Sequence, residues 1–299
     1  MKDQGLYKVA VLLTCYNRKD KTLSFLHSLI NQPAFTVLHA DIYMLDDGST
    51  DGTAAAVKEA FPSVNIIYGT GNLFWAGGMF TIWKYAISQG TYDLFLLFND
   101  DVILLEDSIK RLMDTYERAR NKGTILIGST LSPTSNKLSY GGNVLHRLNH
   151  AAYYPVKPHD HKTLPCHLGN ANVFLVDKAT VEKIGILSDA YTHYLADFDY
   201  TITAFRNGID VLIAPGYYGY CEDDHGVNWL SGKHPLKERI KYLYSVNGLA
   251  YKEYLYYIKK HFPADYFSAF TKLWLKTFFP FIWDTFKKRN ADIENCSIK

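Results

Sequence analysis

The chain has 299 residues, of which 47% are hydrophobic and 21% charged, so it can bury a full core as one large domain or as one domain with an appendage. Its net charge of +2 excludes a chain dominated by basic residues, and we expect no nucleic-acid partner. Its four cysteines are widely scattered without a CxxC pair, and the N-terminus carries no targeting signal, a combination typical of a cytoplasmic protein.

The first half of the chain alternates short apolar runs with amphipathic stretches. We expect strands at 9–13, 42–45, 64–68, 94–98 and 125–127. We expect one helix whose apolar face carries Leu23, Leu26, Leu29 and Ile30. Further helices are expected at 54–60, 80–87 and 108–119. This alternation predicts an α/β fold with a mostly parallel sheet flanked by helices. In such sheets ligands bind beyond the carboxyl ends of the strands, where each polar motif of this half falls.

The second half is less regular. Residues 130–168 are rich in Tyr, His, Pro and Asn, and we expect them to form an insertion that contains strands. After this insertion we expect strands at 169–176 and 211–213, and helices at 179–184 and 198–206.

The first expected strand ends in a polar loop with one aromatic residue. Tyr16 offers a planar side chain, and Thr14, Asn17 and Arg18 lie beside it in the sequence, so this loop could clamp a nucleobase. The alternative is a helix entry capped by Asn17.

The second expected strand ends in two adjacent aspartates, Asp46 and Asp47. Asp51 or Ser49 can cap the following helix, which explains part of this segment structurally. Asp46 is left without such a role. A carboxylate at this position could accept a hydrogen bond from a base N–H or a ribose hydroxyl.

The third expected strand is followed by Asn72, Trp75, Gly77 and Gly78. Two glycines ahead of the helix expected at 80–87 would allow a close backbone approach, and N–H groups at a helix start favour phosphate or sugar oxygens. A tight turn is the alternative reading.

The fourth expected strand runs into Asn99, Asp100 and Asp101. Adjacent carboxylates at the end of a strand repel each other, so a positive group must compensate them. A divalent cation that holds a diphosphate is a common reason to build such a site. A simple loop cap is the alternative.

In this order, the motifs of residues 8–102 resemble the donor half of the family 2 glycosyltransferases, inverting enzymes with the GT-A fold. The motifs are Thr-Cys-Tyr-Asn-Arg, Asp-Asp-Gly-Ser-Thr-Asp-Gly-Thr, Gly-Asn-x-x-x-Ala-Gly-Gly and Asn-Asp-Asp. The Ala-Gly-Gly form is most similar to the rhamnosyl- and galactofuranosyltransferase branch. The resemblance implies that the polar residues named above bind a nucleotide-sugar donor and that Asp101 binds a divalent metal, Mn²⁺ or Mg²⁺. Asn99 stands where the family often has its first acid, and Met79 where the branch often has Asn.

Inverting transfer needs a carboxylate to deprotonate the acceptor hydroxyl, while the metal stabilises the departing diphosphate. Residues 194–200 resemble the family's Glu-Asp-x-Asp segment, which implies that Asp197 is the base, although Ala196 replaces the usual acid. The alternative is that Asp197 and Asp199 are charges at a helix N-terminus.

The related branch also has a His at about this distance after the base, which implies that His225 completes the metal site. Further candidates for acceptor contacts or for orienting the loop are Asp199, His193 and Arg206.

The C-terminal part of the chain has a different charge from the rest. Residues 1–232 hold 19 Lys and Arg against 24 Asp and Glu, whereas residues 233–299 hold 13 against 6. We therefore expect a GT-A catalytic domain at 1–232, with a donor half at about 8–128 and an acceptor half at about 129–232, and a helical extension at 233–299. In the extension an aromatic stripe of Phe267, Phe270, Trp274, Phe278 and Ile282 is flanked by lysines. This pattern fits an interfacial membrane helix, and equally a helix packed on the catalytic domain or on a second subunit of a homodimer.

The sequence thus predicts a metal-assisted inverting enzyme that moves a sugar from a UDP- or dTDP-sugar to a hydroxyl of a glycan or lipid-linked acceptor. By analogy with the family we expect surface polysaccharide assembly at the cytoplasmic face of the membrane. One alternative is a non-catalytic glycan- or lipid-binding module on the same fold, which Asn99 and Ala196 leave open. The other is a sugar nucleotidyltransferase, although residues 14–19 lack the glycine-rich loop that it needs.

Overall fold

The computed structural model describes residues 7–121, 123–223 and 229–285. The chain forms two compact units. The larger contains the residues up to 146 together with 152–223, and the smaller contains 147–151 together with the residues after 223. This division falls nine residues before the boundary expected from charge.

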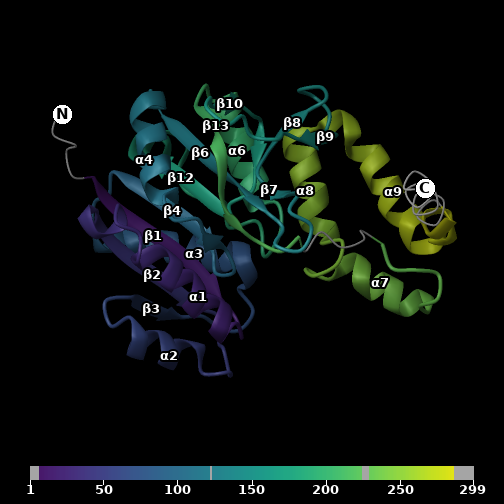
Figure 1. Ribbon diagram of the computed structural model, residues 1–299. Helices are drawn as coiled ribbons and strands as arrows, with labels where there is room; N and C mark the ends of the chain where they lie inside the picture. The colour runs from purple at the N-terminus through teal and green to yellow at the C-terminus, as the bar shows by residue number, and fades with distance from the viewer. Residues whose placement is uncertain (1–6, 122, 224–228, 286–299) are drawn as a thin grey trace, which may run out of the picture. The chain divides into compact units, whose positions relative to one another are not determined.

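The larger unit is built on a ten-stranded sheet, counted over its described residues, in the order β10-β13-β6-β12-β4-β1-β2-β3, with β5 beside β13 and β7 beside β6 (Figure 1). Its strands are β1 (Lys8–Cys15), β2 (His39–Asp46), β3 (Asn65–Tyr68), β4 (Leu94–Asn99), β5 (Ile103–Leu104), β6 (Thr124–Leu131), β7 (Leu138–Tyr140), β10 (Leu164–Pro165), β12 (Val173–Asp177) and β13 (Asp210–Tyr220). β3, β2, β1 and β4 pair in parallel, whereas β12 runs antiparallel to both β4 and β6. The expected mostly parallel α/β sheet is therefore confirmed.

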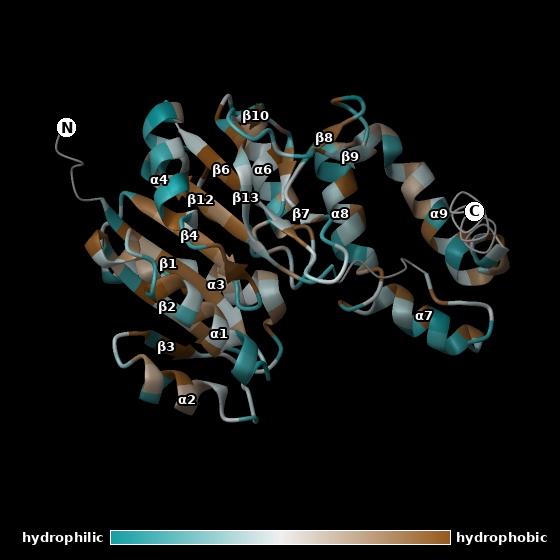
Figure 2. Ribbon diagram, in the orientation of Figure 1, coloured by the Kyte–Doolittle hydropathy of each residue, from teal (hydrophilic) through white to brown (hydrophobic). Residues whose placement is uncertain are grey.

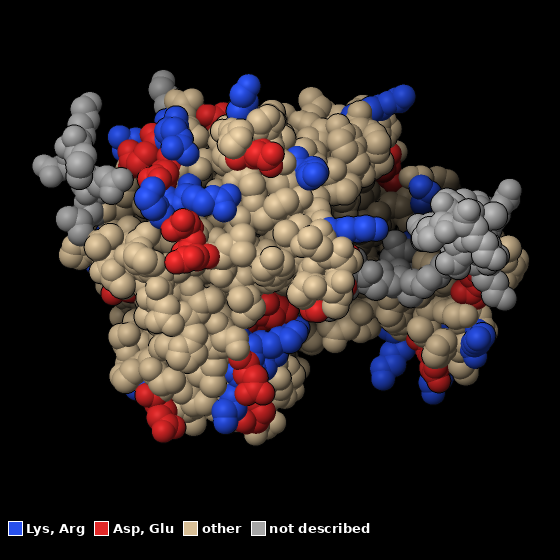
Figure 3. Space-filling view, viewed as in Figure 1, with Lys and Arg blue, Asp and Glu red and all other residues tan. Residues whose placement is uncertain are grey.

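The helices of the larger unit are α1 (Lys19–Ile30), α2 (Thr53–Ala60), α3 (Phe74–Gln89), α4 (Ser108–Ala119), α5 (Lys178–Ile184) and α6 (Ala196–Arg206), with the short 3-10 helix η1 (Phe35–Val37). β1 is buried on both faces from Val9 to Leu13, as a parallel strand covered by helices on both sides requires. The central strands are correspondingly apolar (Figure 2). On the face seen in Figure 3, Lys and Arg lie beside Asp and Glu in small mixed groups.

Two expected elements differ from the structure. The helix expected at 80–87 begins six residues earlier, at Phe74, because the apolar residues before it pack on the sheet. The strand expected at 169–176 is two strands, since residues 170–172 turn the chain between sheets. β11 (Leu168–Gly169) joins β8 (Gly142–Leu145) and β9 (Tyr153–Pro155) in a separate three-stranded sheet, and β12 joins the large one.

The smaller unit contains α7 (Leu236–Tyr244), α8 (Tyr251–His261), the 3-10 helix η2 (Pro263–Asp265) and α9 (Tyr266–Phe278). The carboxylate of Asp265 ties the segment 147–151 to this unit, since it accepts the backbone N–H of Ala151 at 2.7 Å and lies 2.7 Å from Nδ1 of His150. In α9 the buried residues are Ala269, Leu273 and Thr277. Among the helices that the structure describes, none is both long and apolar enough to cross a membrane.

Candidate functional site

Strand register brings the predicted motifs to one edge of the sheet. β1 and β4 pair so that Thr14 lies opposite Asn99, and β1 and β2 pair so that Cys15 lies opposite Asp46. The loops after these three strands therefore leave the sheet side by side. Three sequence motifs that are up to 85 residues apart meet there, as expected for the ligand edge of a parallel sheet.

The loop after β1 is held to the loop after β2 by Asn17. Its backbone adopts a left-handed conformation (φ 50°), its Oδ1 accepts the N–H of Thr50 at 2.7 Å, and its N–H donates to Oγ of Ser49 at 2.9 Å. Asn17 does not cap α1, contrary to the alternative drawn from the sequence. Instead, Asp51 accepts the N–H of Lys19 at 3.0 Å.

Asp46 and Asp47 are both buried and have different partners. Oδ1 of Asp46 accepts the N–H of Ser49 at 2.7 Å, which closes the turn after β2. The two carboxylate oxygens of Asp47 accept three backbone N–H groups, those of Gly71, Leu73 and Phe74, at 2.8–2.9 Å. Asp47 therefore fixes the loop that leads into α3.

The glycine pair has a different role from the one expected. Gly77 and Gly78 lie inside α3 rather than ahead of it, and the N–H groups of Ala76 and Gly77 donate to the backbone carbonyl of Thr192 at 3.0 and 3.2 Å. Asp47 and Thr192 already accept hydrogen bonds from amides at the start of this helix, so these amides are not available for the phosphate or sugar contacts expected from the sequence. Gly78 instead allows α3 to lie close to β1, because a Cβ atom at this position would be 2.7 Å from Oγ1 of Thr14.

Two buried side-chain atoms near the loops have no hydrogen-bond partner among the described residues. They are Nε1 of Trp75, in the first turn of α3, and Oδ1 of Asn99, at the end of β4. Buried polar atoms normally have a hydrogen-bond partner, so these two atoms are candidates for contact with a ligand. Asn72, the remaining predicted residue of this segment, is exposed.

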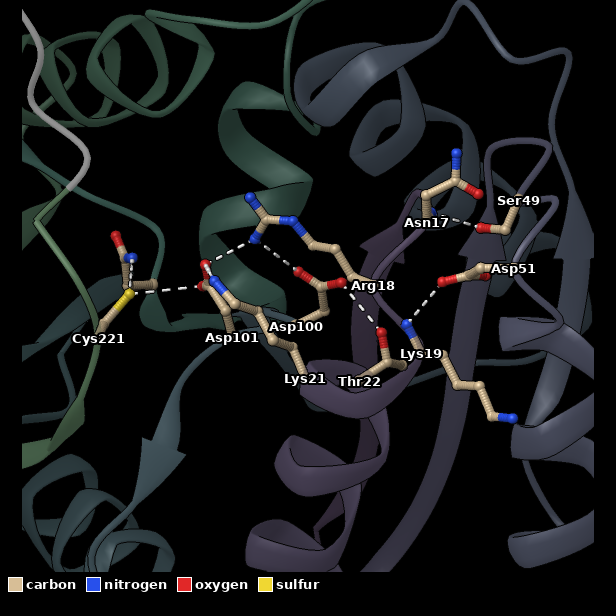
Figure 4. Close-up of polar contacts among 11 residues, drawn as sticks. Asn17, Arg18, Lys19, Lys21, Thr22, Ser49, Asp51, Asp100, Asp101 and Cys221 are labelled. Atoms are coloured by element: carbon tan, nitrogen blue, oxygen red, sulfur yellow. Dashed lines mark hydrogen bonds and ion pairs between the residues drawn. The ribbon is translucent and has the colours of Figure 1, made fainter.

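Asp100 and Asp101 form an ion-pair cluster with the first turn of α1 (Figure 4). Nη1 of Arg18 lies 2.6 Å from Oδ2 of Asp101 and 3.4 Å from Oδ1 of Asp100, and Nζ of Lys21 lies 3.7 Å from Oδ2 of Asp101. Oγ1 of Thr22 donates to Oδ2 of Asp100 at 3.0 Å. Burial raises the pKa of Asp100 to about 6, while Arg18 opposes this shift.

The cluster also includes a residue that the sequence analysis missed. Sγ of Cys221, which follows β13, donates to Oδ1 of Asp101 at 3.4 Å and accepts from Nδ2 of Asn172 at 3.4 Å. Arg18, Lys21 and Thr22 are spaced as one helical turn, so this part could have been found from the sequence. Asn172 carried no such signal.

Asp197 lies in the first turn of α6. Its Oδ1 accepts the N–H of Phe198 at 2.8 Å, and its Oδ2 accepts the N–H of Ala171 at 3.2 Å. Burial raises the pKa of this carboxyl to about 6, while hydrogen bonds from these amides and from the Asn170 side chain lower it. The backbone carbonyl of Asn172 in turn accepts the N–H of Asn99 at 3.3 Å, so the segment 170–172 links Asp197 to the end of β4.

The other candidate site residues lie in different parts of the structure. Asp199 is buried and accepts the hydroxyl of Tyr191 at 2.8 Å, which fixes the segment before α6. The ring of His193 lies 5.8 Å from that of Phe74, between the centroids, at the start of α3. Arg206 is exposed at the far end of α6, about 13 Å from Asp197 along the helix axis, so the structure does not bring it to the other residues. His225 lies outside the described residues.

The described residues contain no group of three or more His, Cys, Asp or Glu side chains that could hold a metal ion. Magnesium, however, is commonly bound by only one or two carboxylates, with the remaining positions filled by substrate phosphates and water. Asp101 fits this mode if Arg18 moves away from Oδ2. Metal binding at this place would therefore depend on a substrate phosphate that binds together with the metal.

Known proteins share a sequence family and a fold with this chain. The sequence model described as "Glycosyl transferase family 2" matches residues 10–164, just over half of the chain. A search of curated proteins finds no match. Similar solved structures include S. aureus TarS 1-349 in complex with UDP (TM-score 0.52, 16% identity, 72% of this chain and 60% of that chain). A mannosyltransferase from Pyrobaculum calidifontis in complex with GDP-Man and Mn²⁺ also matches (TM-score 0.50, 14% identity, 75% and 59%). A third match is GalNAc-T7 with UDP, GalNAc and Mn²⁺ (TM-score 0.55, 11% identity, 71% and 43%).

At these identities the structural likeness extends to the fold alone. The chain spans about 60% of the first two of these structures and less than half of the third.

Proposed function

The chain belongs to glycosyl transferase family 2, and from this premise we propose that it transfers a sugar, with inversion, from a nucleoside-diphosphate sugar to a hydroxyl group of a glycan or lipid-linked acceptor. One observation carries the proposal. The segment 170–172 joins Asp197, a carboxylate whose pKa is raised, to the strand end that bears Asp100 and Asp101. A donor site and a proton acceptor thus belong to one edge of the sheet.

The donor occupies the loops after β1, β2 and β4. Oδ1 of Asp46 is taken by Ser49, and its Oδ2 accepts from the nucleoside, a base N–H or a ribose hydroxyl. The exposed ring of Tyr16 stacks on the base. Asn99 and Trp75 direct their unpartnered polar atoms at the sugar nucleotide.

Asp101, with Asp100 behind it, holds a divalent cation, Mn²⁺ or Mg²⁺, together with the donor's diphosphate. When bound, the metal neutralises negative charge that develops on the departing diphosphate, so no protein acid has to protonate it. Complexes of the mannosyltransferase and of GalNAc-T7 with Mn²⁺ support this part of the proposal.

Asp197 acts as the general base. The acceptor oxygen forms a bond to the anomeric carbon from the side opposite the diphosphate, the bond from that carbon to the diphosphate oxygen breaks, and the hydroxyl proton passes to Asp197. A carboxyl with a pKa of about 6 is ionised at neutral pH and is more basic than an ordinary aspartate, which suits it to this step.

The UDP bound to TarS and the resemblance to the rhamnosyl- and galactofuranosyltransferase branch favour UDP- or dTDP-sugars as donors. Surface polysaccharide assembly at the cytoplasmic face of the membrane would supply an acceptor of the proposed kind.

The test is a calorimetric titration of UDP and of dTDP, each with and without Mn²⁺, on the wild-type protein and on Asp101→Ala. We expect metal-dependent binding of at least one nucleotide, weakened about a hundredfold or more in Asp101→Ala. Asp107→Ala, which removes another acidic residue of the same segment, is the control. If neither nucleotide binds with or without Mn²⁺, the transferase proposal fails and a glycan- or lipid-binding module takes its place.

We also propose that the smaller unit binds to a membrane surface. On α9 Ala269, Leu273 and Thr277 are buried. Phe267 is 76% exposed and Phe278 46%, while Trp274 is half-buried. An apolar hollow is lined by Phe270, Thr271, Trp274, Leu275 and Phe278. Lys272 and Lys276 lie on the same helix, and residues 233–299 hold 13 basic against 6 acidic side chains. An aromatic face with basic residues suits an anionic lipid surface.

Flotation with vesicles tests this part. We expect the protein to float with vesicles that contain anionic phosphatidylglycerol and less with neutral phosphatidylcholine, and Phe267→Ser with Phe278→Ser to weaken the association. The exposed Tyr68, in the larger unit, provides the matched control as Tyr68→Ser. A concentration-dependent dimer that these two Phe substitutions dissociate, without vesicle binding, would assign this face to a homodimer instead.

A further inference from the structure

The Asp100–Asp101 pair is already neutralised by basic side chains of the protein itself. The two side chains are only 6% and 7% exposed, so two adjacent negative charges lie largely out of water. Two like charges in such a place require a positive partner. Arg18 supplies it with a 2.6 Å contact to Asp101, and Lys21 adds a longer one of 3.7 Å.

We infer that Arg18 occupies the place of the divalent cation in the free protein and leaves it for the donor's diphosphate, so that metal and donor bind as a coupled pair. This inference rests on the proposed function and adds a regulatory role for one residue. Figure 4 shows the Arg18 side chain reaching over Asp100 to Asp101, where a metal would have to bind.

Metal binding without a donor is disfavoured by what Asp101 already contacts. Its Oδ2 faces Arg18 and Lys21, and its Oδ1 accepts from the Cys221 thiol. A divalent cation that bound Asp101 would have to break the contact with Arg18 and would then lie a few ångströms from two positive charges. Repulsion at that distance in a partly buried place lowers the affinity substantially.

The donor removes this obstacle because it carries its own negative charge. A guanidinium binds phosphate oxygens with two parallel hydrogen bonds, so Arg18 can exchange one anionic partner for another. With Arg18 on the diphosphate, Oδ2 of Asp101 is available to the metal.

The surroundings allow the Arg18 side chain to move while its backbone stays in place. The side chain is 40% exposed. The backbone on either side is anchored, by Asn17 to the loop after β2 and by the N–H of Lys19 to Asp51. The N–H of Thr22 donates to the carbonyl of Arg18 at 2.9 Å within α1.

Asp100 remains with α1 during this exchange. Its side chain is only 6% exposed to solvent, and the hydroxyl of Thr22 donates to its Oδ2. Asp101 is therefore the carboxylate that changes partners, and Asp100 is the fixed one.

The experiment measures Mn²⁺ affinity by calorimetry or by the paramagnetic resonance of free Mn²⁺, with and without UDP or dTDP, and needs no turnover. The variants are Arg18→Gln, Arg18→Lys and, as a matched control, Lys19→Gln, whose side chain is exposed and points away from the cluster (Figure 4). In the wild type we expect the nucleotide to raise the Mn²⁺ affinity. In Arg18→Gln we expect Mn²⁺ alone to bind about tenfold more tightly and the gain from nucleotide to shrink.

Arg18→Lys keeps a positive charge and should resemble the wild type more than Arg18→Gln does. Lys19→Gln should change neither quantity. The inference is overturned if Arg18→Gln leaves the Mn²⁺ affinity unchanged or weakens it, or if Lys19→Gln has the same effect. Circular dichroism establishes that each variant is folded. If Arg18→Gln does not fold, Arg18→Lys is compared with the wild type, and we expect the coupling between Mn²⁺ and nucleotide binding to be unchanged.

The two proposals can fail separately. If the wild-type protein binds neither nucleotide, the proposed function fails, while Mn²⁺ titration without nucleotide still compares Arg18→Gln with the wild type. If nucleotides bind with metal but Arg18→Gln does not raise the affinity for Mn²⁺ alone, only the role of Arg18 is lost.

Discussion

Two aspartates of the candidate site, Asp100 and Asp197, have the same raised pKa of about 6 but different surroundings. Asp100 lies beside a second carboxylate and a guanidinium, so its charge is part of a compensated cluster. Asp197 has backbone N–H groups and the Asn170 amide as partners, and burial dominates its shift. Burial raises both pKa values, and the groups that oppose the shift differ: charged side chains and a hydroxyl around Asp100, neutral amides around Asp197.

The difference indicates different tasks. A cluster of carboxylates and cations is suited to exchanging one positive partner for another, as a metal–diphosphate site must. A carboxylate stabilised by neutral dipoles can gain or lose a proton without breaking an ion pair, as a general base must.

The largest effect is expected from Asp197→Asn. The amide cannot take the acceptor proton, so we expect the rate of sugar transfer to fall by about 10²–10⁴-fold. Nucleotide binding in the presence of Mn²⁺ should stay within about twofold, because the donor contacts lie elsewhere. Asp189→Asn, which changes an exposed aspartate before α6, is the control. Loss of nucleotide binding in Asp197→Asn together with the rate would place Asp197 in the donor site instead.

A smaller effect is expected from pH. The carboxyl of Asp197 must be ionised to accept a proton, and its pKa is raised from 3.8 to about 6. We therefore expect kcat/KM to be constant above about pH 7 and to fall about tenfold per pH unit below pH 6. With an aspartate of ordinary pKa, the fall in kcat/KM at acid pH would instead begin near pH 4. The profile should be measured between pH 4.5 and 8.5, and an acid limb near pH 4 would contradict the role given to burial.

The smallest effect is expected from Thr22→Val, which removes the hydroxyl that donates to Oδ2 of Asp100. A hydrogen bond to a charged, buried group stabilises a fold by about 1.5–3 kcal/mol, and the isosteric substitution should lower the free energy of unfolding by roughly this amount in urea. The affinity for Mn²⁺ with nucleotide should change less than in Asp101→Ala, since Asp100 is the fixed partner. An equal loss in the two variants would remove the distinction between Asp100 and Asp101.

Much of the strand edge that bears the candidate site could be predicted because it follows from local sequence patterns. Four apolar runs predicted β1 to β4 to within three residues at each end, and the polar motifs directly after them identified the edge. The resemblance to family 2 glycosyltransferases, drawn from the same motifs, is confirmed by the family match to residues 10–164. The branch and the donor remain predictions.

The structure differs from the sequence expectations at the glycine pair and at Arg206. Gly77 and Gly78 could precede a helix or lie within it, and only packing against Thr14 decided the second. Arg206, a candidate for acceptor contacts or for orienting the loop, lies at the opposite end of α6 from Asp197.

The ends of the strands and the carboxylates at those ends follow from local sequence, because hydrophobic periodicity and turn residues act over a few neighbouring positions. The contacts of each carboxylate follow from the folding of the whole chain. Cys221 reaches Asp101 across 120 positions, and the N–H of Ala171 reaches Asp197 across 26. These contacts depend on strand order and register, which are set by the packing of the whole sheet rather than by any segment alone.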